Sequence, residues 1–533
     1  MKHLSGLDSS FLHLESPEMP MHVGGLHILD LPPDYDGDFY EELKHFVASR
    51  MHLAASFQRK LTLMPFDLAN PVWDDDEDID LDYHVRHVML PKPGTTKQLH
   101  QYVARLHSSL LDRSRPLWEF YLFEGLESGQ VALYSKLHHA GMDGQAAQTV
   151  ARAIFDLTQE PRKVKPPRVR HRRNHYQLGI AELASAALSN TGRQLASLVR
   201  ALPEAVRSIA AMLPLKKDED GKRHFKLPGN WTLSPRTQIN VSITNQRAYA
   251  ARSLPFAELK AMAHASGTTI NDLVLAIASG ALRHYLKAYD GLPAKALTAA
   301  VPVSLRESGD SSMDNQVWMM QVGLATDLRD PLARLKAIHE SANAAKDSMG
   351  RFKGIAPTDF PSLGVPWIMS GLAAFFSRAK LADILPPIAN VLISNVPGSP
   401  VPLYIAGAKV TTFYPVSIPA HGVALNITVQ SYNGSLDWGL IACRRAMPDL
   451  ADLADYIVAE HAALRDAILA SPQAVSAAAA PRLPMPKATA KSTAPRGRAR
   501  KPRAEVIAID SRERPAKPAR QRKAAPLAKE ASA

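Results

Sequence analysis

The feature that most constrains the fold is a change of pattern around residue 138. Residues 131–137 form a mainly apolar run whose length predicts a buried strand, whereas residues 145–157 have the apolar spacing of a helix. The turn between them, residues 138–144, reads His-His-Ala-Gly-Met-Asp-Gly. A strand, a turn and a helix in this order place both histidines at a strand end, where a side chain can reach a cleft.

The two histidines, His138 and His139, have the chemistry of a general base. Imidazole, with an unperturbed pKa of about 6.5, accepts a proton from a hydroxyl near neutral pH and then returns it. Asp143 lies close enough to hold the turn or an imidazole ring, although it could also pair with a distant arginine. The alternatives are that the histidines are core residues whose ring nitrogens are hydrogen-bonded within the protein, or that they bind a metal. No further pair of His, Asp or Glu at ligand spacing lies nearby, so no metal is predicted.

Two further patterns accompany this turn. Pro116-Leu-Trp118-Glu119 precedes it, and residues 7–24 read Leu-Asp-Ser-Ser-Phe-Leu-His-Leu-Glu-Ser-Pro-Glu-Met-Pro-Met-His-Val-Gly. From the N-terminus to about residue 465 the chain closely resembles the bacterial wax ester synthase / acyl-CoA:diacylglycerol acyltransferase family. That family belongs to the CoA-dependent acyltransferases, which also include chloramphenicol acetyltransferase and the condensation domains of peptide synthetases.

The resemblance implies an α/β fold of the α+β type. Two chloramphenicol-acetyltransferase-like domains with mixed sheets would form an active-site tunnel between them. We place an N-terminal domain at residues 1–215, with a basic linker at 158–175, and a C-terminal domain at residues 237–470. Residues 216–236 would connect the domains. Residues 471–533 are rich in Ala, Pro, Lys and Arg and poor in large apolar residues, which predicts a disordered tail.

The resemblance also implies roles for individual residues. His139 is expected to accept the hydroxyl proton, His138 to support it, and Asp143 to fix the loop, pairing with an arginine. Substrate contacts are expected at five positions: Glu15, Trp118, Asn271, Ser394 and Asn395. Donors around Asn271 or Ser394 would stabilise the oxyanion. From the residues alone, Trp118 could simply begin a buried strand, Asn271 could cap a helix, and Ser394 could satisfy a turn.

The predicted activity is transfer of a fatty acyl group from acyl-CoA to the hydroxyl of diacylglycerol or of a long-chain alcohol. The hydroxyl oxygen would attack the thioester directly, and no cofactor beyond the co-substrate acyl-CoA is expected. One alternative is a condensation-type amide synthase, although the chain lacks carrier-protein and adenylation segments. Another is a non-enzymatic protein that binds a lipid surface or nucleic acid. Nucleic acid is not favoured because the basic tail has no interleaved aromatic residues.

The net charge of +12 lies in two local segments. Residues 471–533 carry +11 and residues 161–175 carry +7, which leaves the remaining chain at −6. Residues 176–213 have the pattern of an amphipathic helix, with arginines recurring every seven residues, that could pack on the protein or lie in a membrane interface. These segments predict a peripheral association with a membrane or lipid inclusion.

The chain is also predicted to be cytoplasmic. Its single cysteine, Cys443, excludes an intramolecular disulfide. The N-terminus lacks the pattern of a signal peptide, and the apolar stretch at 363–376 is shorter than the roughly 20 residues needed to span a bilayer.

Local patterns predict further helices and strands. Strands are expected at 21–29, 83–89, 297–305, 316–325 and 391–396, and helices at 40–51, 95–111, 252–266, 268–279 and 448–470. Asn433-Gly434 between two strand-like runs predicts a tight hairpin.

Overall fold

The computed structural model describes residues 2–4, 6–62, 71–142, 144–166, 232–289, 291–304, 317–352 and 378–471. The predicted amphipathic helix, half of the basic linker, most of the interdomain connection, nearly all of the tail and Asp143 therefore lie outside the described residues. Among the described helices, none combines the length and the apolarity needed to cross a bilayer.

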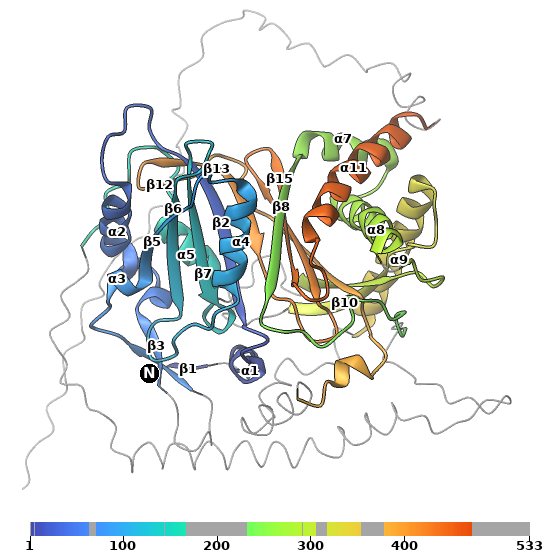
Figure 1. The fold of residues 1–533 in the computed structure, drawn as a ribbon, viewed down its shortest axis with the longest axis horizontal. Coiled ribbons are helices and arrows are strands. Elements are labelled where there is room, and N and C mark those ends of the chain that lie inside the picture. Colours follow the sequence, from blue (N-terminus) through green and yellow to red (C-terminus); the bar gives the residue numbers. More distant parts are fainter. Residues whose placement is uncertain are drawn as a thin grey trace, which may run out of the picture. The chain divides into compact units, whose positions relative to one another are not determined.

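A six-stranded mixed sheet forms the N-terminal half, in the order β12-β13-β2-β7-β6-β5 (Figure 1). Its strands are β12 (Tyr404–Ile405), β13 (Ala408–Val416), β2 (His22–Asp30), β7 (Val131–His138), β6 (Trp118–Glu124) and β5 (Val85–Met89). Only β5 and β6 among these neighbours run parallel. The paired registers align His22 of β2 with His138 of β7.

Helices cover both faces of this sheet. Helices α2 (Phe39–Arg50) and α5 (Gly144–Ile154) pack on one face, and α4 (Thr96–His107) packs on the other. A reciprocal capping box begins α4: Thr95 accepts from the backbone of Gln98, whose side chain accepts from the backbone of Thr95. Helix α1 (Gly6–Leu14), the short helix α3 (Leu81–His84) and a small sheet complete this half. The small sheet contains β1 (Lys2–His3), β4 (Val72–Asp75) and β3 (Arg59–Thr62).

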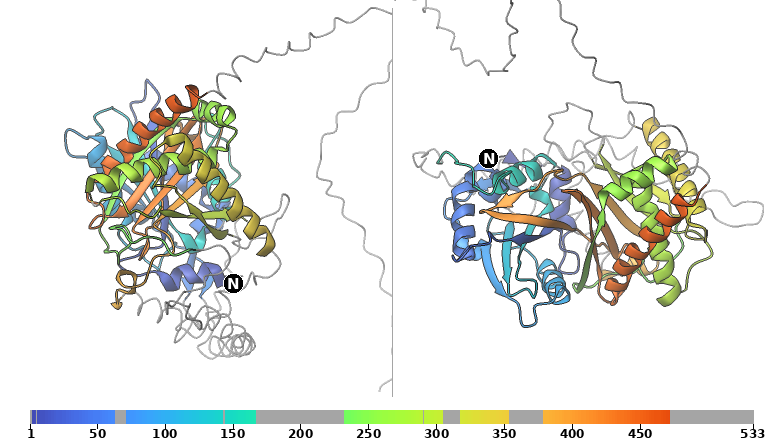
Figure 2. Two further views of the ribbon diagram at one scale, coloured as in Figure 1. Left: turned by 90° about the vertical axis from the view of Figure 1, so that its right-hand side faces the viewer. Right: turned by 90° about the horizontal axis from the view of Figure 1, so that it is seen from above.

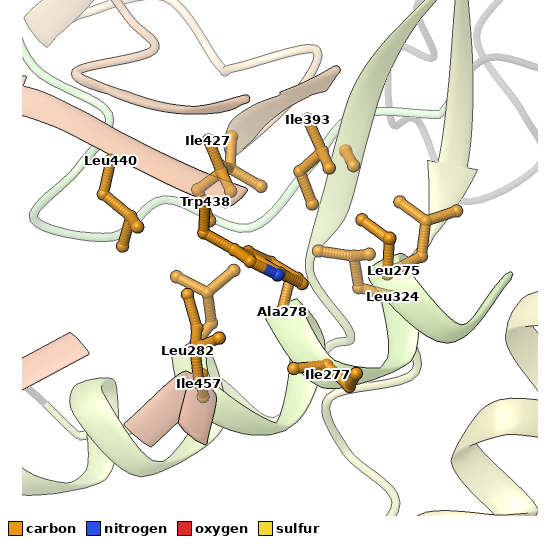
Figure 3. Close-up of a cluster of buried hydrophobic side chains, with 14 of the residues drawn as sticks. Leu275, Ile277, Ala278, Leu282, Leu324, Ile393, Ile427, Trp438, Leu440 and Ile457 are labelled. Carbon is orange, nitrogen blue, oxygen red and sulfur yellow. The ribbon is translucent and has the colours of Figure 1, made fainter. Parts of the chain in front are cut away.

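A second six-stranded mixed sheet, in the order β10-β9-β11-β14-β15-β8, forms the C-terminal half. Its strands are β10 (Val317–Gly323), β9 (Thr298–Ser304), β11 (Val391–Val396), β14 (Leu425–Tyr432), β15 (Ser435–Cys443) and β8 (Arg247–Pro255). Four helices pack around its core: α7 (Phe256–Ser266), α8 (Ile270–Tyr289), α9 (Pro331–Phe352) and α11 (Leu450–Leu469). Trp438 lies within this core among Leu282, Ile427 and Ile457 (Figure 3).

One segment crosses between the halves. Strands β12 and β13 follow β11 in the sequence, but β13 pairs with β2 of the N-terminal sheet and β12 pairs with β13. Figure 1 shows them beside the blue and teal strands. The two sheets approach closely here, because a Cβ on Gly439 would lie 1.7 Å from the carbonyl oxygen of Pro415. The Tyr249 hydroxyl also donates to that carbonyl at 3.3 Å. Assigning all of residues 237–470 to the second half misses this exchanged strand pair.

Most of the predicted elements are present, with two local corrections. The helix expected at 252–266 begins only at Phe256, because β8 continues to Pro255 and pairs with β15. The strand expected at 83–89 begins at Val85, after the helical turn α3. The hairpin is confirmed: β14 and β15 join at Asn433-Gly434, with φ values of 42° and 84°.

Candidate active site

His138 is the last residue of β7 and is locked by two hydrogen bonds. Its Nδ1 accepts from the backbone N–H of Ala140 at 3.1 Å, so Nδ1 carries no proton. Its Nε2 therefore donates to Glu15 Oε2 at 3.0 Å. The first of these bonds caps the short 3₁₀ turn η4 (His139–Gly141) and so orients the residues that follow.

Glu15 is the centre of a buried polar cluster. Its Oε1 accepts from Arg113 at 2.8 Å, and its Oε2 accepts from the Met21 backbone at 3.1 Å and lies 3.3 Å from His22 Nε2. Burial by itself would raise the pKa of Glu15, but hydrogen bonds and charge from His138 and His22 hold that pKa well below its usual range. The glutamate is thus a carboxylate with its acceptor capacity used by protein donors.

Buried histidines extend this cluster toward α4. Burial lowers the pKa of His22 to about 4 and that of His107 well below its ordinary value. His107 Nε2 donates to the Ser417 carbonyl at 2.9 Å, which leaves Nδ1 to accept from the Tyr134 hydroxyl at 2.7 Å. His107 thereby ties α4 and β7 to the end of the exchanged strand β13.

Lys136 lies on the same face of β7 as His138, two residues earlier, and is fully buried. Its Nζ donates to Glu119 Oε2 at 3.1 Å, and the Tyr121 hydroxyl donates to the same oxygen at 2.8 Å. Burial lowers the pKa of Lys136 in spite of this carboxylate. The buried ion pair between Lys136 of β7 and Glu119 of β6 therefore lies next to the active-site turn, and together with His138 it forms a row of buried polar side chains.

His139 has surroundings that differ from those of His138. Its backbone N–H donates to the Met21 carbonyl at 2.8 Å, and its ring stacks on Phe11 of α1 with centroids 4.0 Å apart. Its Nδ1 has no hydrogen-bond partner among the described residues. Burial lowers the pKa of His139 to about 4, so the imidazole is neutral at physiological pH.

Two of the predicted substrate contacts, Trp118 and Glu15, are buried and bonded within the protein. Trp118 is fully buried, stacks on His84 at 4.3 Å and donates its indole N–H to the Phe57 carbonyl at 3.1 Å. This packing makes Trp118 a core residue, as its position at the start of an apolar strand would suggest. The carboxylate of Glu15 is likewise only 3% exposed and is occupied by Arg113 and the histidines. These bonds tie Glu15 to the histidine turn and to Arg113, and its predicted contact with substrate stays a prediction.

The remaining predicted positions lie in the C-terminal half. Asn271 is partly buried in the first turn of α8, beside a cap in which Asp272 and Thr269 bond each other reciprocally. Ser394 and Asn395 lie near the end of β11, where Ser394 is partly buried and Asn395 is exposed. Their proposed contacts with substrate stay predictions, as does the structural role of Asp143.

Sequence reasoning missed several residues of the site. Arg113, His22 and Phe11 contact the active-site turn or its support, although no local pattern marks them as functional. His22 and Phe11 do lie within the N-terminal motif. Polar side chains at every second position, 134, 136 and 138, of a strand that is otherwise mainly apolar were the available signal for this row of buried polar groups.

Comparison with known proteins agrees with the fold and the motif. Residues 4–274 match the family described as wax ester synthase/diacylglycerol acyltransferase catalytic domain, and residues 313–465 match the WS/DGAT C-terminal domain. A putative diacylglycerol O-acyltransferase of Mycobacterium tuberculosis is 37% identical over 450 residues, covering 84% of this chain and 95% of that protein. The O-acyltransferase WSD of Acinetobacter baylyi is 33% identical over 469 residues, covering 86% and 96%.

A solved wax ester synthase/diacylglycerol acyltransferase from Marinobacter aquaeolei is also similar. It is 32% identical, has a TM-score of 0.62, and the match covers 88% of this chain and 100% of that one. The paired mixed sheets and the histidine turn at the end of a central strand define an acyltransferase of the chloramphenicol-acetyltransferase-like class. The chain belongs to the wax ester synthase/diacylglycerol acyltransferase family, which confirms the resemblance seen in its motifs.

Proposed function

We propose that this acyltransferase moves a fatty acyl group from acyl-CoA to the hydroxyl of diacylglycerol or of a long-chain alcohol, with His139 as the proton acceptor. The observation that carries the proposal is the contrast within the histidine pair. His138 uses both ring nitrogens in fixed hydrogen bonds, whereas the imidazole of His139 is neutral and makes no hydrogen bond to another of the described residues. A neutral imidazole with a free lone pair can accept a proton from a hydroxyl.

The reaction then needs no covalent enzyme intermediate. His139 takes the hydroxyl proton as the acceptor oxygen attacks the thioester carbonyl carbon, and a tetrahedral oxyanion forms. The carbon–sulfur bond breaks, the CoA thiolate leaves, and the imidazolium of His139 returns the proton to sulfur. The products are an oxygen ester and free CoA.

Other residues support this chemistry by position. Glu15 and His138 hold the turn, because the glutamate fixes His138 and His138 in turn holds the Ala140 N–H that follows His139. Donors around Asn271 or Ser394 would stabilise the oxyanion. Asp143 would fix the loop through an arginine.

The substrate class follows from the relatives. Those at 33–37% identity are named O-acyltransferases, which favours a hydroxyl acceptor over the amine of a condensation-type amide synthase. The test is to incubate the full chain with radiolabelled palmitoyl-CoA and, in parallel, hexadecanol, diacylglycerol and a long-chain amine. We expect labelled wax ester or triacylglycerol with equimolar release of CoA. Label only in amide, or hydrolysis without an ester product, would contradict the proposal.

Peripheral association with a membrane or lipid inclusion is also proposed, supported by the +18 carried by two basic segments. Each Lys or Arg near an anionic surface contributes about 1 kcal/mol of binding. Deleting residues 471–533 is expected to weaken co-sedimentation with anionic liposomes in a salt-dependent way and to leave kcat on dispersed substrate unchanged. Equal binding of the full and shortened chains to liposomes at low salt would show that the tail does not contribute to membrane association. Tighter binding of the tail to DNA at physiological salt would favour nucleic acid as its partner.

A further inference from the structure

An exposed apolar loop precedes β11 in the C-terminal half. Ile384 is 71% exposed, Leu385 49% and Ile388 47%, and the residues between them are Pro386 and Pro387. In Figure 1 this segment is the gold turn at the lower edge of the molecule. The left view of Figure 2 again places it at the lower edge, where α1 also lies. Three large aliphatic side chains exposed within five residues form an apolar surface that water solvates poorly.

Part of the backbone in and just before this loop is hydrogen-bonded within the protein. Five of its carbonyl groups accept hydrogen bonds from protein donors, and the two prolines have no N–H to satisfy. The acceptors are Leu381 (from the N–H groups of Ile384 and Leu385), Ala382 and Leu385 (from Arg236), Pro387 (from the N–H of Ser234) and Ile388 (from Gln321). An unsatisfied polar group costs several kcal/mol in lipid, so each backbone group that is already bonded within the protein lowers the cost of inserting the apolar side chains.

The loop is also held in a fixed position. The Asp383 carboxylate accepts from the Ser242 backbone at 2.6 Å, and Arg236 bridges the Ala382 carbonyl to that of Asn240. The apolar side chains therefore project from an anchored turn. A preorganised loop loses little conformational entropy when it docks.

The charges around the loop are mainly positive. Arg378 and Lys380 are exposed just before it, and Arg236 is exposed beneath it. Asp383 is the acidic residue within the loop, and its carboxylate is engaged by Ser242. Cations beside apolar tips match an interface in which anionic headgroups surround acyl chains.

We infer that residues 384–388 are a lipid-inserting loop that docks the C-terminal half on an anionic phospholipid surface. This inference rests on the proposed function, in which the acceptor and the acyl chain are lipids that must be drawn from such a surface. The loop ends three residues before β11, the strand that carries Ser394. Docking through it would thus fix the orientation of a strand proposed to line the substrate path.

The test places a fluorescent reporter at the loop. Cys443 is buried, so Leu385→Cys can be labelled selectively with an environment-sensitive dye. The matched control is Leu157→Cys, because Leu157 is 70% exposed in the N-terminal half. Phosphatidylcholine vesicles with phosphatidylglycerol should shift the emission of the Leu385 label to the blue and leave the Leu157 label unchanged. The same response from both labels, or none from the Leu385 label while the protein co-sediments, would overturn the inference.

A binding measurement complements the reporter. The triple variant Ile384→Ser, Leu385→Ser, Ile388→Ser should bind these vesicles on the order of a hundredfold more weakly, since three aliphatic side chains no longer leave water. Leu157→Ser should bind normally, and the triple variant should keep its turnover on dispersed substrate. If the wild-type chain instead self-associates and the triple variant is monomeric in sedimentation velocity, the loop binds a second copy and the inference fails. A chain that inserts the loop but forms no ester would contradict the proposed function alone.

Discussion

The two halves of the molecule have similar mixed sheets but use buried polar groups differently. In the N-terminal half, one row of such groups follows adjoining strands toward the histidine turn: His22, Glu119, Lys136 and His138 occupy β2, β6 and β7. In the C-terminal half the sheet packs around Trp438, and a buried ion pair between Arg334 and Glu460 joins two helices at 2.7 Å. The row of buried polar side chains on the N-terminal strands reaches the strand end that carries the histidine turn. The C-terminal ion pair instead holds two helices together.

The C-terminal ion pair depends on a small residue. A Cβ on Gly280 of α8 would lie 1.9 Å from Glu460 Oε2, so only glycine lets α8 approach the carboxylate this closely. Burial lowers the pKa of Arg334 despite its partner, as it does for Lys136 in the other half. Both halves therefore bear a desolvation cost, but only in the N-terminal half does the buried charge adjoin the proposed catalytic turn.

The largest expected effect comes from removing one partner of each buried cluster. Glu15→Ala leaves Arg113 and the histidines without their carboxylate, and Arg334→Ala leaves the buried Glu460 with only His284 as a partner, so each should lower the free energy of unfolding by up to about 3–5 kcal/mol. The two variants should differ in kcat. Glu15→Ala should lower the kcat of the folded fraction, whereas Arg334→Ala should leave it unchanged. Chemical denaturation and turnover below the transition measure both quantities. An equal loss of kcat in Arg334→Ala would remove the distinction between the halves.

A smaller effect is expected from the two buried tryptophans. Trp118→Phe loses the hydrogen bond to the Phe57 carbonyl and Trp438→Phe leaves a cavity, so each should cost about 1–3 kcal/mol of stability. Because the Trp118 indole is buried, neither change should alter KM for acyl-CoA or acceptor. A rise in KM in Trp118→Phe with unchanged Tm would restore Trp118 as a substrate contact.

The smallest expected effect is that of pH near neutrality. A base must be unprotonated, and the lowered pKa of His139, about 4 against an ordinary 6.5, keeps it so well below pH 7. The rate kcat/KM should therefore stay level as the pH falls from neutrality and decline only as it approaches about 4. Circular dichroism at each pH controls for acid unfolding. A decline centred near 6.5 in folded protein would show that His139 is not desolvated as the structure indicates.

Local patterns predicted the active-site turn because its signals are local. A buried strand marked by an apolar run, a turn marked by two glycines and an amphipathic helix are each encoded within about a dozen residues. The hairpin at Asn433-Gly434 is of the same kind, since both residues tolerate positive φ. These are the elements that the structure confirmed.

Features that depend on distant partners were not predictable in this way. The exchange of β13 into the N-terminal sheet leaves no trace in its own sequence, because an apolar strand does not specify which sheet it joins. Glu15 has the polarity of a ligand contact, and its true partners Arg113 and His138 lie 98 and 123 positions away. Trp118 has the size of a substrate contact, but only the packing of Phe57 and His84 shows that it belongs to the core.

The central claim is that His139 transfers the proton while His138 holds the turn. Its most direct test is kcat of His139→Ala and His138→Ala, each with its melting temperature, on the same acyl-CoA and acceptor. We predict that His139→Ala loses about 10²–10⁴ in kcat with little change in Tm. His138→Ala should lose less in kcat and more in Tm, because it releases Glu15 and the Ala140 N–H. A larger loss of kcat in well-folded His138→Ala would contradict the account.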